Sequence, residues 1–423
     1  MPRRFGLFAL LGSIVISTAA FAADWPRFRG ANCDGISTET GLNGDWAAKP
    51  PALLWQLPGM GRGFSSLSII GNVAYTMGDF GQDQKTIAID LATQKILWSV
   101  KTGRAWRQNN DPGSRCTPTV DGDFLYVVGG TGDMACVDRT KGSVVWQKDF
   151  AKDFGGKMMS GWGYAESPLV DGDRVIVTPG GRDAMIVALN KKTGEVIWKA
   201  AVPNLGPKGR DGAGYSSIVA AEIAGVKQYI TLVGKGGIGV AAADGKFLWG
   251  YNKAANGVAN ITTPVVKGDL VFFSSAYNTG SGLVKLSSDG KGGVKADEVY
   301  FLDAKTFQNH HGGVVLIGDY LYGGHNQNAG IPTCIDFKTG KIMWTAKAPS
   351  GGSAAVFAYE DRLIFRYEKG AVVALVEPSP EGFKLKGQFK AAVDEGPSWS
   401  HPVIHDGKLY LRTQDVLMCY DLK

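Results

Sequence analysis

Sixteen side chains that could bind a ligand lie in segments that precede short β-type runs of the sequence. In chain order they are Arg62, Arg107, Asn109, Asn110, Arg115, Trp162, Tyr164, Glu166, Arg210, Asp211, Tyr215, Asn260, His310, His311, Trp399 and His401. The arginines can donate to an anion, the indoles offer flat stacking surfaces, and Glu166 and Asn260 offer oxygen ligands for a hard cation. These residues predict a binding site. The alternative is a set of polar groups that only pair with one another.

His310 and His311 suggest a metal site, which their spacing does not favour. Adjacent residues of a strand point to opposite faces, so at most one of the pair would face a shared channel. Zinc needs three or four converging ligands, and no Cys or His spacing in the chain offers such a set. We therefore expect hydrogen-bonded polar histidines here and no metal.

An internal repeat supplies the elements that would position these residues. Asp90, Asp138, Asn190 and Asp336 each precede a tryptophan by eight residues, and a Thr-Gly turn lies between the two in several copies. Weaker copies run over residues 216–249, 262–301 and 353–389, where another aromatic residue replaces the tryptophan in the last two. Repeats of roughly 40 to 50 residues with several short strands are typical of propeller blades.

Each repeat reads as four short strands, so one blade is a four-stranded antiparallel sheet. Blades converge at the axis and separate at the rim, so we expect small residues on the innermost strands and bulky tryptophans between the outer parts of neighbouring blades. The glycine of the Thr-Gly turn should adopt positive φ, and the preceding Asp should accept hydrogen bonds from turn amides.

The two ends of the chain complete one another. The last copy, residues 401–421, stops before its fourth strand, and residues 53–57 (LLWQL) form a β segment with a tryptophan but no repeat of their own. Joining them removes exposed sheet edges. The sequence therefore predicts an all-β, eight-bladed propeller over residues 53–423, closed by an N-terminal strand, with residues 23–52 forming an arm that packs on it.

The first 22 residues have the layout of a secretory signal, with Arg3 and Arg4, an apolar run over residues 5–16 and an Ala-Phe-Ala end. The run is too short to span a bilayer permanently, and no other stretch approaches the length needed, so we expect no membrane span. No cysteine follows Ala22, so a lipid anchor is not expected. The prediction is an exported protein, periplasmic or extracellular. Its net charge of +6 is too small and scattered to indicate nucleic acid.

The chain has five cysteines, at positions 33, 116, 136, 334 and 419. Cys136, Cys334 and Cys419 occupy one repeat position in different blades. Equivalent positions of different blades cannot approach within disulfide reach, so we expect three buried free thiols. Cys33 and Cys116 stay open as a pair, because an arm that crosses the ring could reach an inner strand.

Several segments resemble the PQQ-like (pyrroloquinoline quinone) β-propeller repeat family of secreted bacterial proteins: residues 25–30 (WPRFRG), 162–168 (WGYAESP), 178–181 (TPGG), 310–313 (HHGG) and the Thr-Gly turns. The resemblance covers essentially the whole predicted mature chain. It extends to proteins described as quinoprotein alcohol dehydrogenase-like and, more distantly, to the BamB outer-membrane assembly factor. It implies the propeller fold and two kinds of activity.

The resemblance to the enzymes of this family implies that PQQ and Ca²⁺ are bound and that two adjacent cysteines form a disulfide over the cofactor. No two cysteines of this chain are adjacent. Our first hypothesis is a binding or scaffold module that takes a ligand, glycan or envelope protein at the channel mouth. The alternatives are a PQQ- and Ca²⁺-dependent alcohol or sugar dehydrogenase and an outer-membrane assembly scaffold of BamB type. The repeats distinguish the fold well and the activity poorly.

Overall fold

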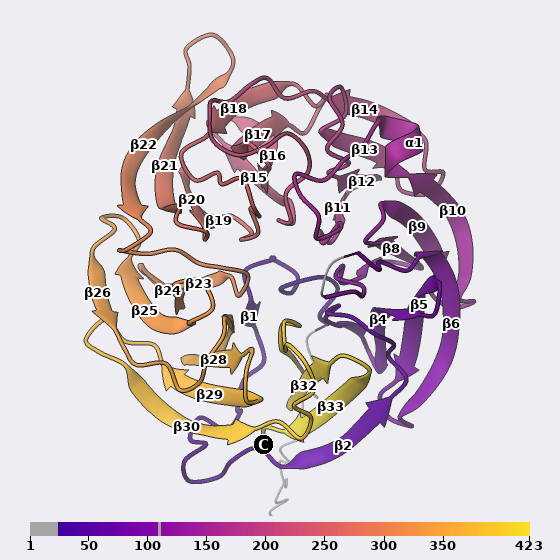
Figure 1. Ribbon diagram of the computed structural model, residues 1–423, viewed down its shortest axis with the longest axis vertical. Coiled ribbons are helices and arrows are strands. Elements are labelled where there is room, and N and C mark those ends of the chain that lie inside the picture. Colours follow the sequence, from indigo (N-terminus) through magenta and orange to yellow (C-terminus); the bar gives the residue numbers. More distant parts are fainter. Residues whose placement is uncertain (1–23, 109–110) are drawn as a thin grey trace, which may run out of the picture.

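The computed structural model describes residues 24–108 and 111–423. Strands of these residues form eight sheets arranged as a ring around a central axis (Figure 1). Neighbouring strands within each blade run antiparallel, and successive blades follow one another along the chain. The predicted eight-bladed propeller is therefore confirmed.

The first four blades, in chain order and from the inner strand outward, contain the following strands: β3 (Ser68–Ile70), β4 (Val73–Phe80), β5 (Asp83–Asp90) and β6 (Lys95–Arg104); β7 (Thr119–Asp121), β8 (Phe124–Val128), β9 (Asp133–Asp138) and β10 (Ser143–Asp149); β11 (Leu169–Asp171), β12 (Arg174–Val177), β13 (Ile186–Asn190) and β14 (Val196–Ala200); β15 (Val219–Ile223), β16 (Val226–Val233), β17 (Gly236–Ala241) and β18 (Phe247–Tyr251). One short helix, α1 (Phe150–Phe154), follows β10, and Asp149 caps its N-terminus.

The last four blades contain the following strands: β19 (Val265–Lys267), β20 (Leu270–Ser275), β21 (Gly280–Ser288) and β22 (Val294–Asp303); β23 (Val314–Ile317), β24 (Tyr320–His325), β25 (Ile331–Asp336) and β26 (Ile342–Thr345); β27 (Ala354–Tyr359), β28 (Arg362–Tyr367), β29 (Val372–Glu377) and β30 (Lys384–Lys390); β31 (Val403–His405), β32 (Lys408–Thr413), β33 (Val416–Asp421) and β2 (Leu53–Pro58). The seventh of the eight blades also gains β1 (Ile36–Ser37), which pairs in parallel with β27.

The ring closes through β2, as the sequence predicts. β2 pairs antiparallel with β33, and Trp55 lies opposite Cys419 in the register. The indole of Trp55 also packs near the ring of Tyr410 on β32, with 6.0 Å between the ring centroids. Figure 1 shows the indigo β2 and the yellow β33 side by side where the two ends of the propeller meet.

Tryptophans of one blade pack on the glycine of the last turn of the next blade. A Cβ atom on Gly142 would come within 2.6 Å of the Trp98 indole, and one on Gly194 within 2.8 Å of Trp146. Trp98 Nε1 also donates to the carbonyl of Arg139 at 3.0 Å, in the same turn as Gly142. These glycines therefore serve two purposes, because they adopt positive φ (63° and 72°) and leave room for the neighbouring indole.

The aspartates before these turns act as predicted. The Asp138 carboxylate accepts from the amides of Thr140 and Lys141, both at 3.0 Å. These bonds hold the pKa of Asp138 below its usual range, at about 2. The contact between blades and the hydrogen bonds of the turn thus recur in several blades. The loops that lead into the innermost strands are therefore attached to a rigid ring and extend toward its axis.

No helix among the described residues is long and apolar enough to cross a membrane. The predicted secretory signal, residues 1–22, lies outside the described residues and stays a prediction.

Candidate functional site

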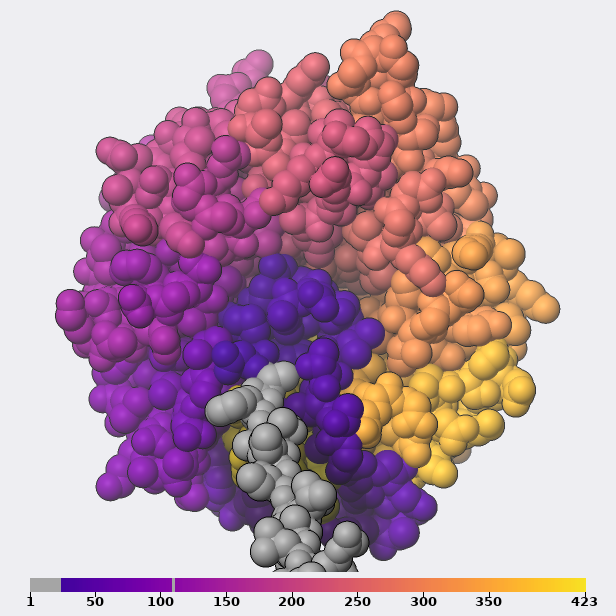
Figure 2. All heavy atoms as spheres, turned by 180° about the vertical axis from the view of Figure 1, so that it is seen from behind, coloured from indigo at the N-terminus to yellow at the C-terminus, as the bar shows by residue number. Residues whose placement is uncertain are grey.

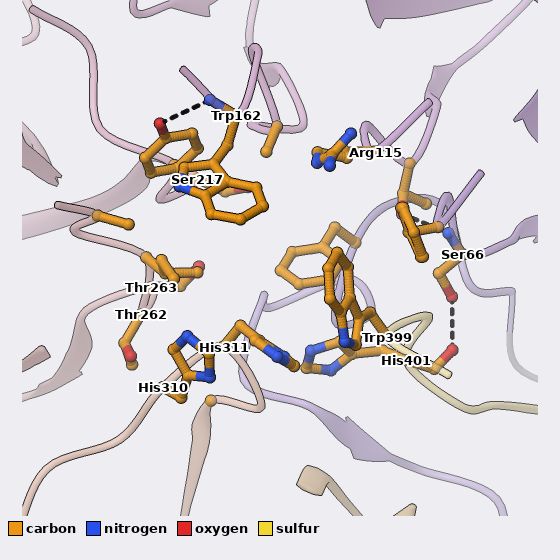
Figure 3. A pocket seen from close by; sticks show the side chains of 18 of the residues that line it. Ser66, Arg115, Trp162, Ser217, Thr262, Thr263, His310, His311, Trp399 and His401 are labelled. Atoms are coloured by element: carbon orange, nitrogen blue, oxygen red, sulfur yellow. Dashed lines mark hydrogen bonds between the residues drawn. The ribbon is translucent and has the colours of Figure 1, made fainter. Parts of the chain in front are cut away.

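A cavity of about 430 Å³ lies on the axis of the ring. Its walls come from the loops that lead into the innermost strands of several blades and from the N-terminal arm. Seven of the sixteen predicted residues line it: Arg115, Trp162, Tyr215, His310, His311, Trp399 and His401. Figure 3 shows the indoles of Trp162 and Trp399 directed into this space, with Arg115 to one side and the histidines to the other.

One wall is a continuous row of rings that begins at a guanidinium. Arg115 lies over the ring of Phe64 at 5.2 Å, and the Phe64 and Trp399 rings lie 4.3 Å apart at an interplanar angle of 31°. Trp399 is followed by His311 at 5.2 Å and His311 by His310 at 4.3 Å, all between ring centroids. A flat ligand would find aromatic faces on this wall and a cation at its end.

Backbone carbonyls hold the Arg115 guanidinium in place. Its Nη1 donates to Gly113 at 2.8 Å and its Nη2 to Asp111 at 2.7 Å. Burial lowers the pKa of Arg115 to about 10, although attraction to the Asp111 carboxylate opposes the shift. Arg115 therefore remains charged at neutral pH, in surroundings where a charge interacts more strongly than in water.

The three histidines of the cavity are neutral at pH 7. Burial lowers the pKa of His310, His311 and His401 to about 3, and the mutual repulsion of nearby cationic groups adds to the shift. His310 is hydrogen-bonded on both sides, to Tyr277 Oη at 2.9 Å and to Ser353 Oγ at 2.8 Å. These imidazoles can exchange hydrogen bonds with a ligand and carry no charge of their own.

Tyr277 reaches His310 from a backbone conformation that residues other than glycine rarely adopt, with φ 57°. Such a conformation persists where the surrounding structure favours it, and it is common at binding sites. Burial raises the pKa of Tyr277, so its phenol stays protonated. Tyr277 thus adds a hydroxyl to the histidine side of the cavity.

The expectation that only one of His310 and His311 faces the channel is wrong, because both line the cavity. They precede β23, which begins at Val314, and the two-residue alternation of a strand does not apply to them. Within the described ranges, no group of three or more His, Cys, Asp or Glu side chains is arranged to hold a metal ion.

Several other predicted residues lie elsewhere. Arg107 is exposed and donates to the carbonyl of Gly81, and Arg210 and Asp211 are also exposed. Tyr164 is buried and donates to the carbonyl of Pro179 at 2.8 Å. Arg62 lines a neighbouring depression of about 370 Å³. Asn109 and Asn110 lie outside the described residues.

The cavity residues that sequence reasoning missed include Phe28, Arg29, Phe64, Asp111 and Tyr277. Phe28 and Arg29 belong to the WPRFRG segment, which the sequence analysis named only for its family resemblance. Phe64 precedes β3 and Tyr277 follows β20, and neither residue belongs to a sequence pattern that recurs in the other blades. The arm segment was thus the one signal that could have indicated further lining residues.

Comparison with known proteins places the chain in a family. The family described as "Outer membrane protein assembly factor BamB" matches residues 82–346. The chain belongs to this PQQ-like β-propeller family. No curated protein sequence matches the chain.

Solved structures of the same fold are distant in sequence from this PQQ-like propeller. BamB from Moraxella catarrhalis aligns with a TM-score of 0.61 and 12% identity, over 88% of this chain and 99% of that one. Quinohemoprotein alcohol dehydrogenase from Comamonas testosteroni aligns with a TM-score of 0.62 and 12% identity, over 94% of this chain and 80% of that one. The quinohemoprotein alcohol dehydrogenase ADHIIG from Pseudomonas putida HK5 gives 0.64 and 12%, over 95% and 80%. At these identities the similarity concerns the fold.

The oxygen ligands predicted for a Ca²⁺ ion are not in the cavity, which corrects that expectation. Glu166 is buried outside it, and its Oε1 accepts from the Thr178 amide at 2.6 Å. Burial raises the pKa of Glu166 to about 7. The Asn260 amide donates to the carbonyls of Val233 and Gly234, at 3.0 and 3.1 Å.

The Asn260 side chain thus serves the fold, whereas Glu166 Oε2 is buried without a hydrogen-bond partner among the described residues. Asp111 is the one acidic residue that lines the cavity in the part of the chain that is described. A Ca²⁺ ion takes six to eight oxygen ligands, several of them carboxylates, and the donor set of this cavity does not fit it.

The cysteines give no support to a disulfide in the described chain. All five are free and buried. Cys33 packs with residues of the fourth and fifth blades, and Cys116 belongs to a cluster of the first three, so the pair that the sequence left open does not form. Cys136, Cys334 and Cys419 are buried free thiols, as predicted.

Proposed function

We propose that this PQQ-like propeller is an exported binding protein whose axial cavity takes a small ligand with a flat aromatic face and an anionic group. The observation that carries the proposal is the half-buried Arg115 guanidinium, held 5.2 Å over Phe64 at the end of a row of rings in contact with one another. Concave sites with aromatic walls and a few placed polar groups are the usual form of small-molecule sites.

Charge decides between an anionic and a cationic ligand. Arg29 and Arg115 line the cavity, the histidines there are neutral, and Asp111 is the single carboxylate along its described walls. A cationic ligand would meet two guanidinium groups. An anion would gain charge-assisted hydrogen bonds in a partly desolvated place.

Melting curves with planar aromatic carboxylates test this proposal. The probes are naphthalene-2-carboxylate and PQQ, in EDTA. We expect at least one to raise the melting temperature of the wild-type protein and of Arg107→Gln, whose arginine lies outside the cavity. Arg115→Gln and Trp162→Leu should lose at least tenfold in affinity. No shift with any probe, or an unchanged response of Arg115→Gln, would contradict the proposal.

The dehydrogenase alternative makes a different prediction. A PQQ enzyme of this family would show alcohol- or sugar-dependent dye reduction after addition of PQQ with Ca²⁺. We expect no such reduction, because Asp111 is the single carboxylate along the described walls of the cavity and the predicted ligands Glu166 and Asn260 lie outside it. Substrate-dependent reduction that EDTA abolishes would replace the binding proposal with the enzyme.

The assembly-scaffold alternative rests on the family description alone. Export rests on the first 22 residues of the sequence. Cell fractionation with N-terminal sequencing of the released protein tests export, and a mature chain that begins at Ala23 is the expected result. Retention of Met1 in a cytoplasmic fraction would contradict it.

A further inference from the structure

The N-terminal arm closes one end of the channel. It pairs with the innermost strand of the first blade, where Trp25 and Ile69 exchange two backbone hydrogen bonds of 2.8 Å, and Pro26 accepts from the Val120 amide of the second blade. Further along, Gly35 accepts from Ala358 of the seventh blade. Figure 2, seen from behind, shows the indigo arm over the middle of the ring. The arm therefore forms part of the cavity wall.

Arg29 lies in this arm and is buried to 5% exposure. Its backbone has φ 61°, and its guanidinium donates to the carbonyls of Cys33, Asp34 and Val314. All three acceptors are carbonyls, so no carboxylate neutralises the charge by direct hydrogen bonding. The Asp34 carboxylate attracts this charge without accepting a hydrogen bond from it, so Arg29 lacks the direct ion pair that buried charges normally have.

One nitrogen of Arg29 has no hydrogen-bond partner among the residues that the structure describes. This nitrogen, Nη1, lies against Gly313, where a Cβ atom would come within 2.4 Å of it, and the same Cβ would lie 3.7 Å from His401 Cε1. Arg29, Gly313 and His401 all line the axial cavity. The unpartnered donor is thus placed at the cavity wall, at a point that a glycine leaves open.

Two other nitrogen atoms of the same wall share this condition. Trp399 Nε1 and His311 Nε2 are buried without a hydrogen-bond partner, and their rings lie 5.2 Å apart. Buried donors that lack acceptors are rare in folded proteins. Arg29 and Trp399 therefore have a common need for an acceptor, which a ligand oxygen would meet, whereas Nε2 of the neutral His311 donates or accepts according to its tautomer.

We propose that Arg29 is an anion-binding residue of the axial cavity, which takes an anionic oxygen of the carboxylate or phosphate type together with the indole N–H of Trp399. This inference rests on the proposed binding function. It means that the N-terminal arm selects for a charged ligand. Arg115 then holds the ring end of the ligand against Phe64, and Arg29 holds a second polar end. The ligand class is a planar aromatic molecule that carries at least one anionic group.

Calorimetric titration with three matched probes tests the inference: naphthalene-2-carboxylate, 2-naphthyl phosphate and the neutral naphthalene-2-carboxamide. The wild-type protein should bind an anionic probe at least tenfold more tightly than the amide. The anionic probe whose affinity exceeds that of the amide by the larger factor shows whether the site prefers a carboxylate or a phosphate. In Arg29→Lys and in Trp399→Phe the preference should fall at least fivefold, while the affinity for the amide stays within twofold.

Arg27→Met is the matched control on the arm, because Arg27 donates only to the carbonyl of Ile218 at 3.4 Å and does not line the cavity. Trp399→Phe keeps a ring against Phe64 and removes the N–H alone, so it tests the inference even if Arg29→Lys fails to fold. An unchanged preference in both variants would overturn the role of Arg29 and leave cavity binding intact. Equal binding of amide and anions by the wild type would overturn the anionic class. Failure of all probes to bind would overturn the proposed function and this inference with it.

Discussion

The guanidinium of Arg366 donates a hydrogen bond of 2.7 Å to the backbone carbonyl of Arg412 in the next blade. Arg412 in turn donates to the carbonyls of Met60 and Gly61, at 3.1 and 3.0 Å, in the segment that leads from β2 to the first blade. Both arginines are fully buried. They connect the seventh, eighth and first blades at the point where the ring closes.

Replacement of Arg412 by Met should weaken this junction. The carbonyls of Met60 and Gly61 would lose their partner, and buried acceptors without partners are costly. We expect a loss of about 3 kcal/mol or more in the free energy of unfolding. Urea unfolding measures it, with Arg182→Met, an exposed site, as the control. Equal stability of both variants would show that the junction does not depend on Arg412.

Removal of residues 24–57 should leave the ring open. β33 would then present an unpaired edge, and the eighth blade would keep only three strands. We expect aggregation or failure to fold, measured by size-exclusion chromatography and circular dichroism, whereas a chain that begins at Asp24 should behave as a soluble monomer. A soluble monomeric product of the longer deletion, with unchanged melting, would count against closure by β2.

The cysteines predict a simple thiol count. Burial raises the pKa of Cys116, Cys136 and Cys419 to about 12, so these thiols are both inaccessible and protonated. A thiol reagent added without reductant should label none of the five in the native protein and all five in denaturant. Only three reactive thiols after denaturation would indicate a disulfide between Cys33 and Cys116.

The buried histidines predict loss of stability in acid. The pKa values of His310, His311 and His401 are about 3 in the folded protein, against an ordinary histidine value of 6.5. Between these values the unfolded chain binds more protons, so the free energy of unfolding falls as the pH drops from 6.5 toward 3.

His311→Asn should reduce that slope by up to about 1.4 kcal/mol per pH unit. Urea unfolding at pH 4 to 6 measures the slope, and the range from pH 7 to 9 is the internal control, where the curves of the variant and the wild type should run parallel. Identical slopes at pH 4 to 6 would show that His311 titrates normally.

The fold could be predicted because its signals are local and repeated. Trp98 and Gly142 occupy fixed repeat positions, and their contact between blades recurs at Trp146 and Gly194. The closing strand could be predicted because the β segment around Trp55 has the tryptophan of an outer strand but belongs to no repeat of its own.

The candidate site was less accessible to prediction, for physical reasons. Glu166 and Asn260 have the chemistry of cation ligands, yet both lie outside the cavity, where a backbone amide donates to Glu166 Oε1 and the Asn260 amide donates to backbone carbonyls. Arg115 lines the cavity and Arg107 does not. The two differ in their position relative to the axis of the ring, which the sequence does not specify. Arg29 reaches the cavity through contacts of the arm with distant blades, and no repeat predicts those contacts.

A crystal structure of the protein with saturating naphthalene-2-carboxylate and no added Ca²⁺ tests the central claim most directly. We predict the naphthalene ring in the axial cavity, against the aromatic wall of Phe64 and Trp399, with the carboxylate hydrogen-bonded to Arg29 or Arg115. Density for the probe outside this cavity, or a cavity that holds solvent alone at saturating probe, would contradict the account.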